Sequence, residues 1–409
     1  MKITDVKTVL LTGPSGNDPY LKAARQYRSA AFIEIHTDTD LVGIGEPYIG
    51  YHAPELIPNI VEFFKPILVG LSESEIEPRR LWERMYRCAN FWARTGLGVN
   101  VLAGLEGALW DLRGKMVGLP VFELLGGKFH DVLPCYATGC ASNYPWSELL
   151  SKLDLYREAG FRAAKVAAGW SDIAKATTFS ARGSQAWVDM ESEKLETIRK
   201  HLGNEFQVCL DGHMSNPEKE DSSLWDVATA KAVLRALEPY DLLFFEEPLH
   251  YNDVSGYAEL CASTSVSVAG GECLSTREEF WQFAERGAFD IAQPDAAYIG
   301  IWAFMDVARM FATKGKRVAT HAWASGVGVM ENIHAAFATP NVAILEIPPL
   351  AGPLHTEIYA EGYRFADGYI LPPEGPGLGI RLSESTKHRF PFVPGSGEWN
   401  PVHGKSDIL

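Results

Sequence analysis

The hydrophobic pattern of the first 120 residues changes once, from alternation to a helical repeat. Apolar and polar side chains alternate in ITDVKTVLLT and in AAFIEIHTDTDLVGIGEP, which predicts strands with a hairpin around residues 37–40. From Leu56 to Gly118 apolar residues recur at intervals of three and four, as in VNVLAGLEGALWDLRGKMVG, and Pro120 then supplies a stop. An antiparallel sheet followed by helices predicts an α+β domain over residues 1–130.

From about residue 133 short apolar runs alternate with amphipathic, helix-length segments such as ESEKLETIRKHLG. Eight runs are predicted as strands: VLPCYATG, RAAKVAAG, FQVCLDGH, DLLFFEEP, VSVAGGEC, DIAQPDAA, RVATHAWA and VAILEIP. Strands that alternate with helices are typical of a parallel α/β barrel, here over residues 131–352. The Gly- and Pro-rich segment 353–409 is predicted to pack back on the first domain.

Composition and charge narrow the class of protein. The chain has 409 residues, 46% of them hydrophobic and 22% charged, which is typical of a globular protein with more than one domain. The net charge of −15, without a basic and aromatic block, makes nucleic acid an unexpected partner. No run approaches the ~20 apolar residues of a membrane span, and the N-terminus lacks a signal-peptide pattern. Six cysteines without a CxxC pair fit reduced thiols, so a cytoplasmic enzyme is expected.

Three acidic residues, Asp211, Glu246 and Glu272, each close one of the predicted strands. Because the carboxyl ends of parallel barrel strands open on the same face, these side chains are expected to meet there. Clustered carboxylates stay ionised together only near a cation, and hard oxygen donors favour Mg²⁺, with Mn²⁺ as a substitute. The alternative is that each acid is solvated or caps the next helix.

Seven motifs occur in one order along the chain: FRAAKVAAG, LDGH, FFEEPL, GGEC, AQPDAAYIG, ATHAWASGVG and AILEIP. Together they resemble the enolase superfamily, and within it the mandelate racemase and muconate lactonizing enzyme branch that includes sugar-acid dehydratases. The resemblance covers nearly the whole chain. It implies a modified (β/α)8-type barrel with an N-terminal α+β capping domain, and one Mg²⁺ held by Asp211, Glu246 and Glu272. It also implies removal of a proton from the carbon next to a carboxylate.

The resemblance also implies an acid–base pair on strands six and seven. His321 aligns with the barrel histidine of the family, and Asp295 is its expected partner. A buried Asp orients an imidazole and raises its basicity. The alternative for His321 is a core residue without chemistry. Glu346 matches a position that can hydrogen-bond the substrate carboxylate if protonated, and its alternative is a structural salt bridge.

The second strand departs from the racemases of the family, which carry Lys-x-Lys there. This chain has Lys165 and Ala167, and because side chains alternate on a strand, one inward cation is missing. Lys165 remains as a base or as a carboxylate clamp. By the same alternation Asp211 and His213 face inward, an Asp-x-His motif like that of galactonate and mannonate dehydratases. His213 can replace the missing lysine, or it can be a spacer or a hydrogen-bond donor.

These residues predict a lyase, namely a Mg²⁺-dependent hydro-lyase that dehydrates an acid sugar to a 2-keto-3-deoxy acid. His321 and His213 divide the roles of base and acid, and either assignment fits. One alternative is a racemase, epimerase or cycloisomerase that works through the same enolate. Another is a non-catalytic protein that binds a sugar acid. The family resemblance also implies a homo-oligomer.

The identity of the acid depends on residues that cannot be placed from sequence. Aromatic and basic side chains of the predicted cap loops are candidates for binding the distal end of the substrate: Tyr20, Arg25, Tyr48, Tyr51, His52, Trp92 and Arg94. Their alternative is an oligomer interface. Trp323, two residues after His321, is expected on the same inward side, where it can pack on a substrate or fill the top of the barrel. The segment 169–190 is longer than typical βα loops of ~2–6 residues and is predicted to cover the site.

Overall fold

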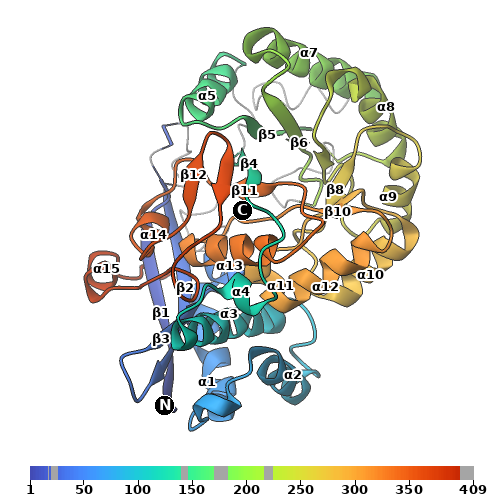
Figure 1. The fold of residues 1–409 in the computed structure, drawn as a ribbon. Helices are drawn as coiled ribbons and strands as arrows, with labels where there is room; N and C mark the ends of the chain where they lie inside the picture. The colour runs from blue at the N-terminus through green and yellow to red at the C-terminus, as the bar shows by residue number, and fades with distance from the viewer. Residues whose placement is uncertain (17, 20–25, 140–145, 170–182, 216–223, 397–409) are drawn as a thin grey trace.

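The computed structural model describes the whole chain except residues 17, 20–25, 140–145, 170–182, 216–223 and 397–409. Two parts are visible in Figure 1, an antiparallel sheet with helices and a barrel of parallel strands inside a ring of helices. Within the described residues, no helix combines the length and apolar character needed to cross a membrane.

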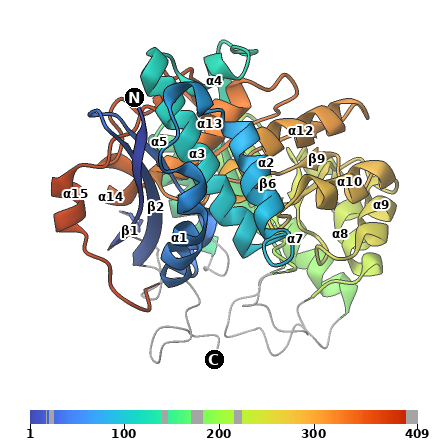
Figure 2. The ribbon, with the colours of Figure 1, turned by 90° about the horizontal axis from the view of Figure 1, so that it is seen from below.

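The first part, called the cap below, begins with the strands β1 (Ile3–Pro14), β2 (Tyr27–Thr37) and β3 (Val42–Gly45), which pair antiparallel in that order. The predicted hairpin joins β2 to β3. The helices are α1 (Ile57–Leu68), α2 (Pro78–Ala89) and α3 (Leu97–Val117). Figure 2 shows α1 and α3 beside β1 and β2, and these elements are in contact.

Helix α3 joins the cap to the barrel because it contacts both. It packs on β3 on one side and on α11 (Ala296–Ile299) of the barrel on the other. Glycine makes the first contact possible, since a Cβ on Gly45 would lie 2.0 Å from the carbonyl oxygen of Gly104. Most of α3 is buried, so it lacks the one-sided apolar stripe of a surface helix.

Each predicted barrel run contains one strand. The strands are β4 (Leu133–Ala137), β5 (Ala163–Ala167), β6 (Gln207–Asp211), β7 (Phe245–Glu246), β8 (Val268–Gly270), β9 (Ile291–Ala292), β10 (Arg317–Val318) and β11 (Leu345–Ile347). Neighbours from β4 to β10 pair in parallel, and β11 pairs in parallel with β4. A parallel bridge between Val318 and Val342 connects the β10 and β11 segments and completes the barrel.

Helices surround these strands (Figure 1). They are α5 (Trp146–Glu158), α7 (Ser184–Leu202), α8 (Val227–Leu237), α9 (Val254–Cys261), α10 (Arg277–Arg286), α12 (Ile301–Ala312) and α13 (Gly326–Phe337), with the short α4 (Val121–Leu124) and α14 (Pro353–Thr356). Side chains cap several helix starts, as when Asp226 accepts from the backbone N–H of Thr229 at 2.8 Å. The C-terminal segment adds β12 (Arg364–Ala366), β13 (Tyr369–Leu371) and α15 (Glu384–Arg389).

The C-terminal segment contacts both parts of the molecule. Strand β13 pairs antiparallel with β4, so the β12–β13 hairpin extends the barrel sheet. Further along, the backbone N–H of Thr12 in β1 donates to the carbonyl of Phe390 at 3.2 Å. The segment therefore runs from the barrel to the cap.

The interior of the barrel is filled with side chains below the strand ends. A separate apolar cluster occupies it, made of Tyr136, Ala163, Cys209, Phe244, Ala269, Ile291, Ala319 and Ile344. These positions alternate with residues that face the surrounding helices. Polar side chains at the carboxyl ends of the strands consequently lie next to this apolar layer.

Candidate functional site

Two carboxylates lie side by side where neighbouring strands end. Asp211 is the last residue of β6 and Glu246 the last of β7, and the parallel register makes them direct partners. Glu272 follows two residues after β8. One ligand atom each from Asp211, His213 and Glu272 lie within 4.8 Å of one another. Burial, followed by the charge of Asp211, raises the pKa of Glu246 well above its ordinary value.

Lys165 balances part of this negative charge. Its Nζ lies 3.0 Å from Oδ2 of Asp211, 2.9 Å from Oε2 of Glu246 and 3.1 Å from Oε1 of Glu346. Burial lowers the pKa of Lys165, but these three carboxylates raise it well above its usual range. This geometry fits a cation that pairs with buried carboxylates, and a role of Lys165 as a base stays a prediction.

The carboxylate cluster fits a hard divalent cation. Oε1 of Glu246 and Oδ2 of Asp211 are buried and accept no hydrogen bond in the described part of the chain, although Lys165 pairs with the latter. Buried carboxylate oxygens without donors are costly unless a cation approaches them. Oxygen donors of this kind suit Mg²⁺ or Mn²⁺.

Glu247 and Cys273 form a second group with Glu272. Ligand atoms of Glu247, Glu272 and Cys273 also lie within 4.8 Å of one another. Burial, followed by the charge of Glu272, raises the pKa of Glu247 well above its ordinary value. Glu247 adopts φ 41°, an uncommon backbone conformation for a residue with a side chain. Glu247 therefore lies beside Glu272 at the edge of the cluster.

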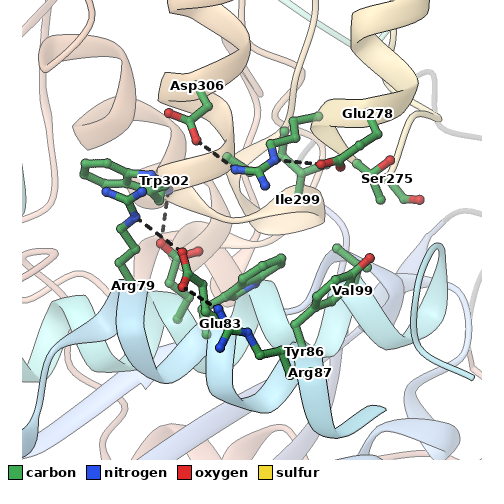
Figure 3. A pocket seen from close by; sticks show the side chains of 15 residues that line it. Arg79, Glu83, Tyr86, Arg87, Val99, Ser275, Glu278, Ile299, Trp302 and Asp306 are labelled. Carbon is green, nitrogen blue, oxygen red and sulfur yellow. Dashed lines mark hydrogen bonds and ion pairs between the residues drawn. The ribbon is translucent and has the colours of Figure 1, made fainter. Parts of the chain in front are cut away.

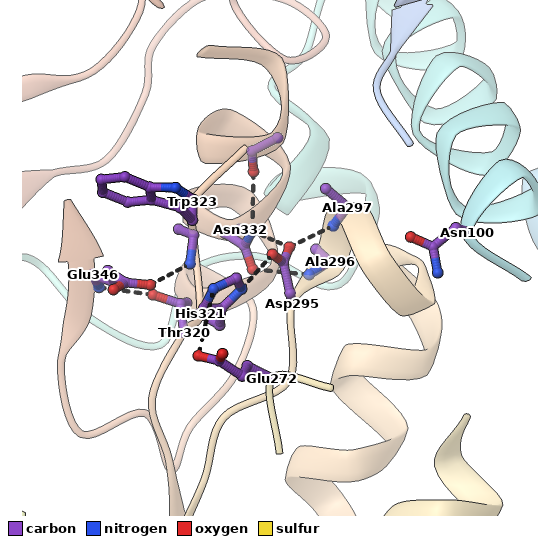
Figure 4. A network of polar contacts seen from close by, with 12 residues as sticks. Asn100, Glu272, Asp295, Ala296, Ala297, Thr320, His321, Trp323, Asn332 and Glu346 are labelled. Carbon is purple, nitrogen blue, oxygen red and sulfur yellow. Dashed lines mark hydrogen bonds and ion pairs between the residues drawn. The ribbon is translucent and has the colours of Figure 1, made fainter. Parts of the chain in front are cut away.

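His321 connects the cluster to a buried aspartate (Figure 4). Its Nδ1 lies 2.8 Å from Oδ2 of Asp295, and its Nε2 lies 3.6 Å from Oε2 of Glu272. Asp295 therefore orients the ring with Nε2 toward the cluster. Burial lowers the pKa of His321, but Glu272 and Asp295 raise it to about 10.

Asn332 holds Asp295 in place, and sequence reasoning missed it. Its Nδ2 donates to Oδ1 of Asp295 at 2.7 Å, and its Oδ1 accepts from the N–H of Ala296 at 2.9 Å. The N–H of Ala297 donates to the same Oδ1 of Asp295 at 2.8 Å. The sequence signal is weak, because Asn332 is one of three polar residues, with Glu331 and His334, in the helix GVGVMENIHAAF, in which every residue is buried.

His213 reaches the cluster through a turn, and this differs from the prediction. Strand β6 ends at Asp211, so strand alternation does not extend to His213. The residue adopts φ 45°, and its Nδ1 lies 3.1 Å from Oδ1 of Asp211. Left-handed backbone at a residue with a side chain is uncommon and is concentrated at functional sites.

Glu346 lies in a network of hydrogen bonds at the end of the barrel strands. Its Oε2 accepts from the N–H of Ala322 at 2.5 Å, and its own N–H donates to Oγ1 of Thr320 at 2.8 Å. Burial raises the pKa of Glu346, but Lys165 and His321 outweigh it, so the pKa lies below its ordinary value. Oε1 of Glu346 pairs with Lys165 at 3.1 Å, as the salt-bridge interpretation expects, and its contact with a substrate carboxylate stays a prediction.

Aromatic residues of the cap lie next to the ring of His321. The ring of Tyr48, in the 3-10 turn Tyr48–Tyr51, lies 5.3 Å from the ring of His321 and 5.5 Å from that of Tyr298. The ring of His52 lies 5.4 Å from that of Tyr48. This aromatic group closes the side of the site that faces the cap.

The other distal candidates have different surroundings. Trp92 packs on Phe63 and Phe64 of α1, with ring centroids 5.1 and 6.0 Å away. Arg94 accepts through its carbonyl from the hydroxyl of Tyr86 at 3.3 Å. Tyr20, Arg25 and most of the long loop after β5 lie outside the described residues.

A separate cavity of about 300 Å³ lies between α2 of the cap and the starts of α10 and α12 (Figure 3). Opposite charges on its walls pair with each other, as when Arg277 lies 2.8 Å from Glu278 and 3.4 Å from Asp306. None of the clustered carboxylates described above lines it. The candidate site is therefore the open end of the barrel.

Comparison with known proteins agrees with this architecture. Residues 18–126 match the mandelate racemase / muconate lactonizing enzyme N-terminal domain, and residues 148–386 match the enolase C-terminal domain-like family. D-galactonate dehydratase of Ralstonia nicotianae is 30% identical over 373 residues, covering 87% of this chain and 89% of that protein.

Two further relatives match over almost their whole length. D-galactarolactone cycloisomerase of Agrobacterium fabrum is 27% identical over 407 residues, covering 96% of this chain and all of that protein. The crystal structure of a racemase from Streptomyces coelicolor A3(2) with bound magnesium superposes with a TM-score of 0.78 at 25% identity, covering 95% of this chain and 99% of that one. The chain thus belongs to the mandelate racemase / muconate lactonizing enzyme family of the enolase superfamily.

Proposed function

We propose that the protein is a Mg²⁺-dependent dehydratase of an acid sugar. One observation carries the proposal: two histidines reach the same carboxylate cluster from different strands. His213 lies 3.1 Å from Asp211, and His321 lies 3.6 Å from Glu272. Loss of water from a hydroxy acid needs a base for the α-proton and an acid for the departing hydroxide. Two titratable rings at one site supply both.

Asp211, Glu246 and Glu272 would hold Mg²⁺, which supplies positive charge against the charge that develops on the substrate carboxylate. His321 accepts the α-proton at Nε2, while Asp295 stabilises the resulting imidazolium. Glu272 is the group that most raises the pKa of His321. If Glu272 held the cation, its charge would be offset and the pKa of His321 would be lower, which would favour Nε2 as a base.

His213 donates a proton to the departing hydroxyl in the second half of the reaction. Its ring contacts Oδ1 of Asp211, whereas Lys165 contacts Oδ2 of the same carboxylate. Lys165 stays protonated and balances the buried carboxylates. The reverse division of roles between His213 and His321 is chemically equivalent, and the isotope experiment below separates the two.

The relatives support the reaction class. D-galactonate dehydratase matches over most of both chains at 30% identity. D-galactarolactone cycloisomerase matches over the full length at 27%. The second match favours one alternative, a cycloisomerase in which the dyad of His321 and Asp295 alone moves the proton. The expectation of a homo-oligomer stays a prediction.

Incubating the Mg²⁺-loaded protein with aldonic and aldaric acids in D2O tests the proposal. Mass spectrometry should detect loss of one water from one acid. Deuterium uptake without loss of water would replace the dehydratase by the isomerase alternative. In His213→Asn we expect deuterium exchange at the α-carbon without dehydration. Loss of exchange in that variant would assign the base to His213 instead of His321.

A further inference from the structure

Glu46, which belongs to the N-terminal part of the molecule, accepts hydrogen bonds at the N-terminus of the barrel helix α13. It follows directly after β3, and its carboxylate lies at the N-terminus of α13. Oε1 accepts from the N–H of Ser325 at 3.0 Å, and Oε2 accepts from the N–H of Gly328 at 2.9 Å and from Oγ of Ser325 at 2.6 Å. Ser325 is itself the N-cap residue, but its side chain forms no capping bond to the helix. A residue of the cap domain thus supplies the hydrogen-bond acceptor that the side chain of Ser325 does not provide to the N-terminus of α13.

A second residue of the cap holds the loop that precedes α13. Nη2 of Arg28, in β2, donates to the carbonyl of Trp323 at 2.5 Å. The guanidinium carbon lies 4.5 Å from the centroid of the Tyr51 ring, within cation–π range. Arg28 is only 4% exposed. The loop 321–325 is therefore held at Trp323 and Ser325 by two residues of opposite charge from the other part of the molecule.

The loop 321–325 and the helix α13 are both linked to His321. The loop starts at His321 itself, four residues before Ser325. Helix α13 also carries Asn332, which donates to Asp295 at 2.7 Å. Asp295 in turn orients His321 at 2.8 Å. A shift of α13 or of the loop would move both the ring and its partner.

We propose that Glu46 and Arg28 are positioning residues, through which the cap sets the His321 ring against the carboxylate cluster. The proposal rests on the proposed function, in which His321 moves the substrate proton. It gives the cap a role in the acid–base step in addition to covering the substrate. Displacement of a reacting group by about 1 Å can cost about a hundredfold in rate, so a loosened loop should be visible in turnover.

Glu106 offers a matched control. It is a buried cap carboxylate, 1% exposed, in α3, and it also accepts from a barrel backbone N–H, that of Trp302 at 3.1 Å. Trp302 is in α12 and lines the separate cavity, away from the loop 321–325. In the described residues Glu106 hydrogen-bonds Trp110 and Trp302 but neither the loop 321–325 nor α13, so loss of this contact weakens the interface between the cap and the barrel without removing a hydrogen bond to that loop or that helix.

The test compares Glu46→Gln, Arg28→Lys and Glu106→Gln in the full-length protein. An amide places an N–H₂ group against one of the N–H donors of α13, so Glu46→Gln should loosen the helix start. Proton NMR should detect the downfield signal of the His321 Nδ1–H bonded to Asp295, assigned by its loss in His321→Asn. We expect this signal to broaden or disappear in Glu46→Gln and Arg28→Lys and to persist in Glu106→Gln.

Kinetics on the acid that is turned over supply the second measurement. We expect kcat to fall by about tenfold to a hundredfold in Glu46→Gln, with KM changed less than twofold, and Glu106→Gln to match the wild type. An unchanged NMR signal together with unchanged kcat in Glu46→Gln would overturn the proposal. Equal losses in Glu46→Gln and Glu106→Gln would overturn it too, because they would show a general interface effect.

A second variant and a measurement that does not need turnover complete the test. If Glu46→Gln does not fold, Ser325→Ala removes one of the three hydrogen bonds and should give the same changes at smaller size. The NMR signal does not depend on turnover. If the wild type dehydrates no acid, the proposed function fails, while the NMR comparison still decides whether Glu46 and Arg28 hold His321 in place.

Discussion

Nζ of Lys165 lies 2.9 Å from Oε2 of Glu246, and the other oxygen of this buried carboxylate accepts no hydrogen bond from the described residues. The ammonium group thus covers one side of Glu246 and leaves the other for a cation. This division explains how a lysine and a metal ion can share a set of carboxylates. It also makes Lys165 and the metal partly interchangeable in their effect on stability.

Replacement of Lys165 by Met should destabilise the metal-free protein by about 3–5 kcal/mol, because it leaves buried carboxylates without their cation. Saturating Mg²⁺ should recover part of this loss. Denaturant unfolding of both proteins with EDTA and with Mg²⁺ measures the effect. A matched control is Lys200→Met, which removes an exposed lysine that pairs with Glu196 at 2.8 Å. Identical losses for Lys165→Met with and without Mg²⁺ would contradict the interpretation.

Binding of Mg²⁺ should release protons and strengthen as the pH rises. Burial and the charge of Asp211 raise the pKa of Glu246 well above its ordinary value, so the ligand must lose a proton when the cation binds. Isothermal titration calorimetry in two buffers of different ionisation enthalpy counts the released protons. At a Mg²⁺ concentration of 100 times Kd the protein should gain about 2.7 kcal/mol of stability. Buffer-independent heats would exclude proton release.

Removal of the His213 imidazole should separate catalysis from metal binding. His213→Asn should lower the dehydration rate by about a hundredfold or more, the usual contribution of a positioned acid or base. The Mg²⁺ affinity should change little, because the three carboxylates remain. His201→Asn, which removes an exposed histidine that lies 2.8 Å from Asp154, is the control. Full dehydration activity in His213→Asn would remove this residue from the mechanism.

The stability of the protein should fall in mildly acidic solution, in part through His334. Burial lowers the pKa of this histidine from 6.5 to about 3. A depressed pKa in the folded state means that its contribution is complete above pH 6.5 and is lost as the pH falls toward 3, since only the unfolded chain binds the proton. Between pH 6.5 and 5 this amounts to about 2 kcal/mol.

Other buried groups titrate in the same range, so the comparison must isolate His334. The free energy of unfolding of the wild type minus that of His334→Gln should decrease by about 2 kcal/mol between pH 6.5 and 5. Chemical denaturation at several pH values measures this difference. A difference that does not change with pH would show that His334 is not buried in its neutral form.

The strands and their terminal acids could be predicted from the sequence because they depend on local patterns. A run of apolar residues between two helices is a buried strand wherever it lies in the fold. Asp211 and Glu246 close such runs, and the parallel register then makes them neighbours. The same local reasoning failed at His213, since β6 ends at Asp211 and a left-handed turn, not strand alternation, directs the ring.

Beyond Asp295, the residues that hold His321 in place were decided by tertiary structure alone. Glu46 and Ser325 are 279 positions apart in the chain, and Asp295 and Asn332 are 37 apart. Their contacts require the packing of the cap on α13 and the placement of α13 beside the end of β9, which no local pattern encodes. The sequence therefore determined the strand order, the acids at the strand ends and the family. Packing decided which groups hold His321 and in which direction the pKa values of the buried carboxylates shift, because burial and proximity act only once distant segments meet.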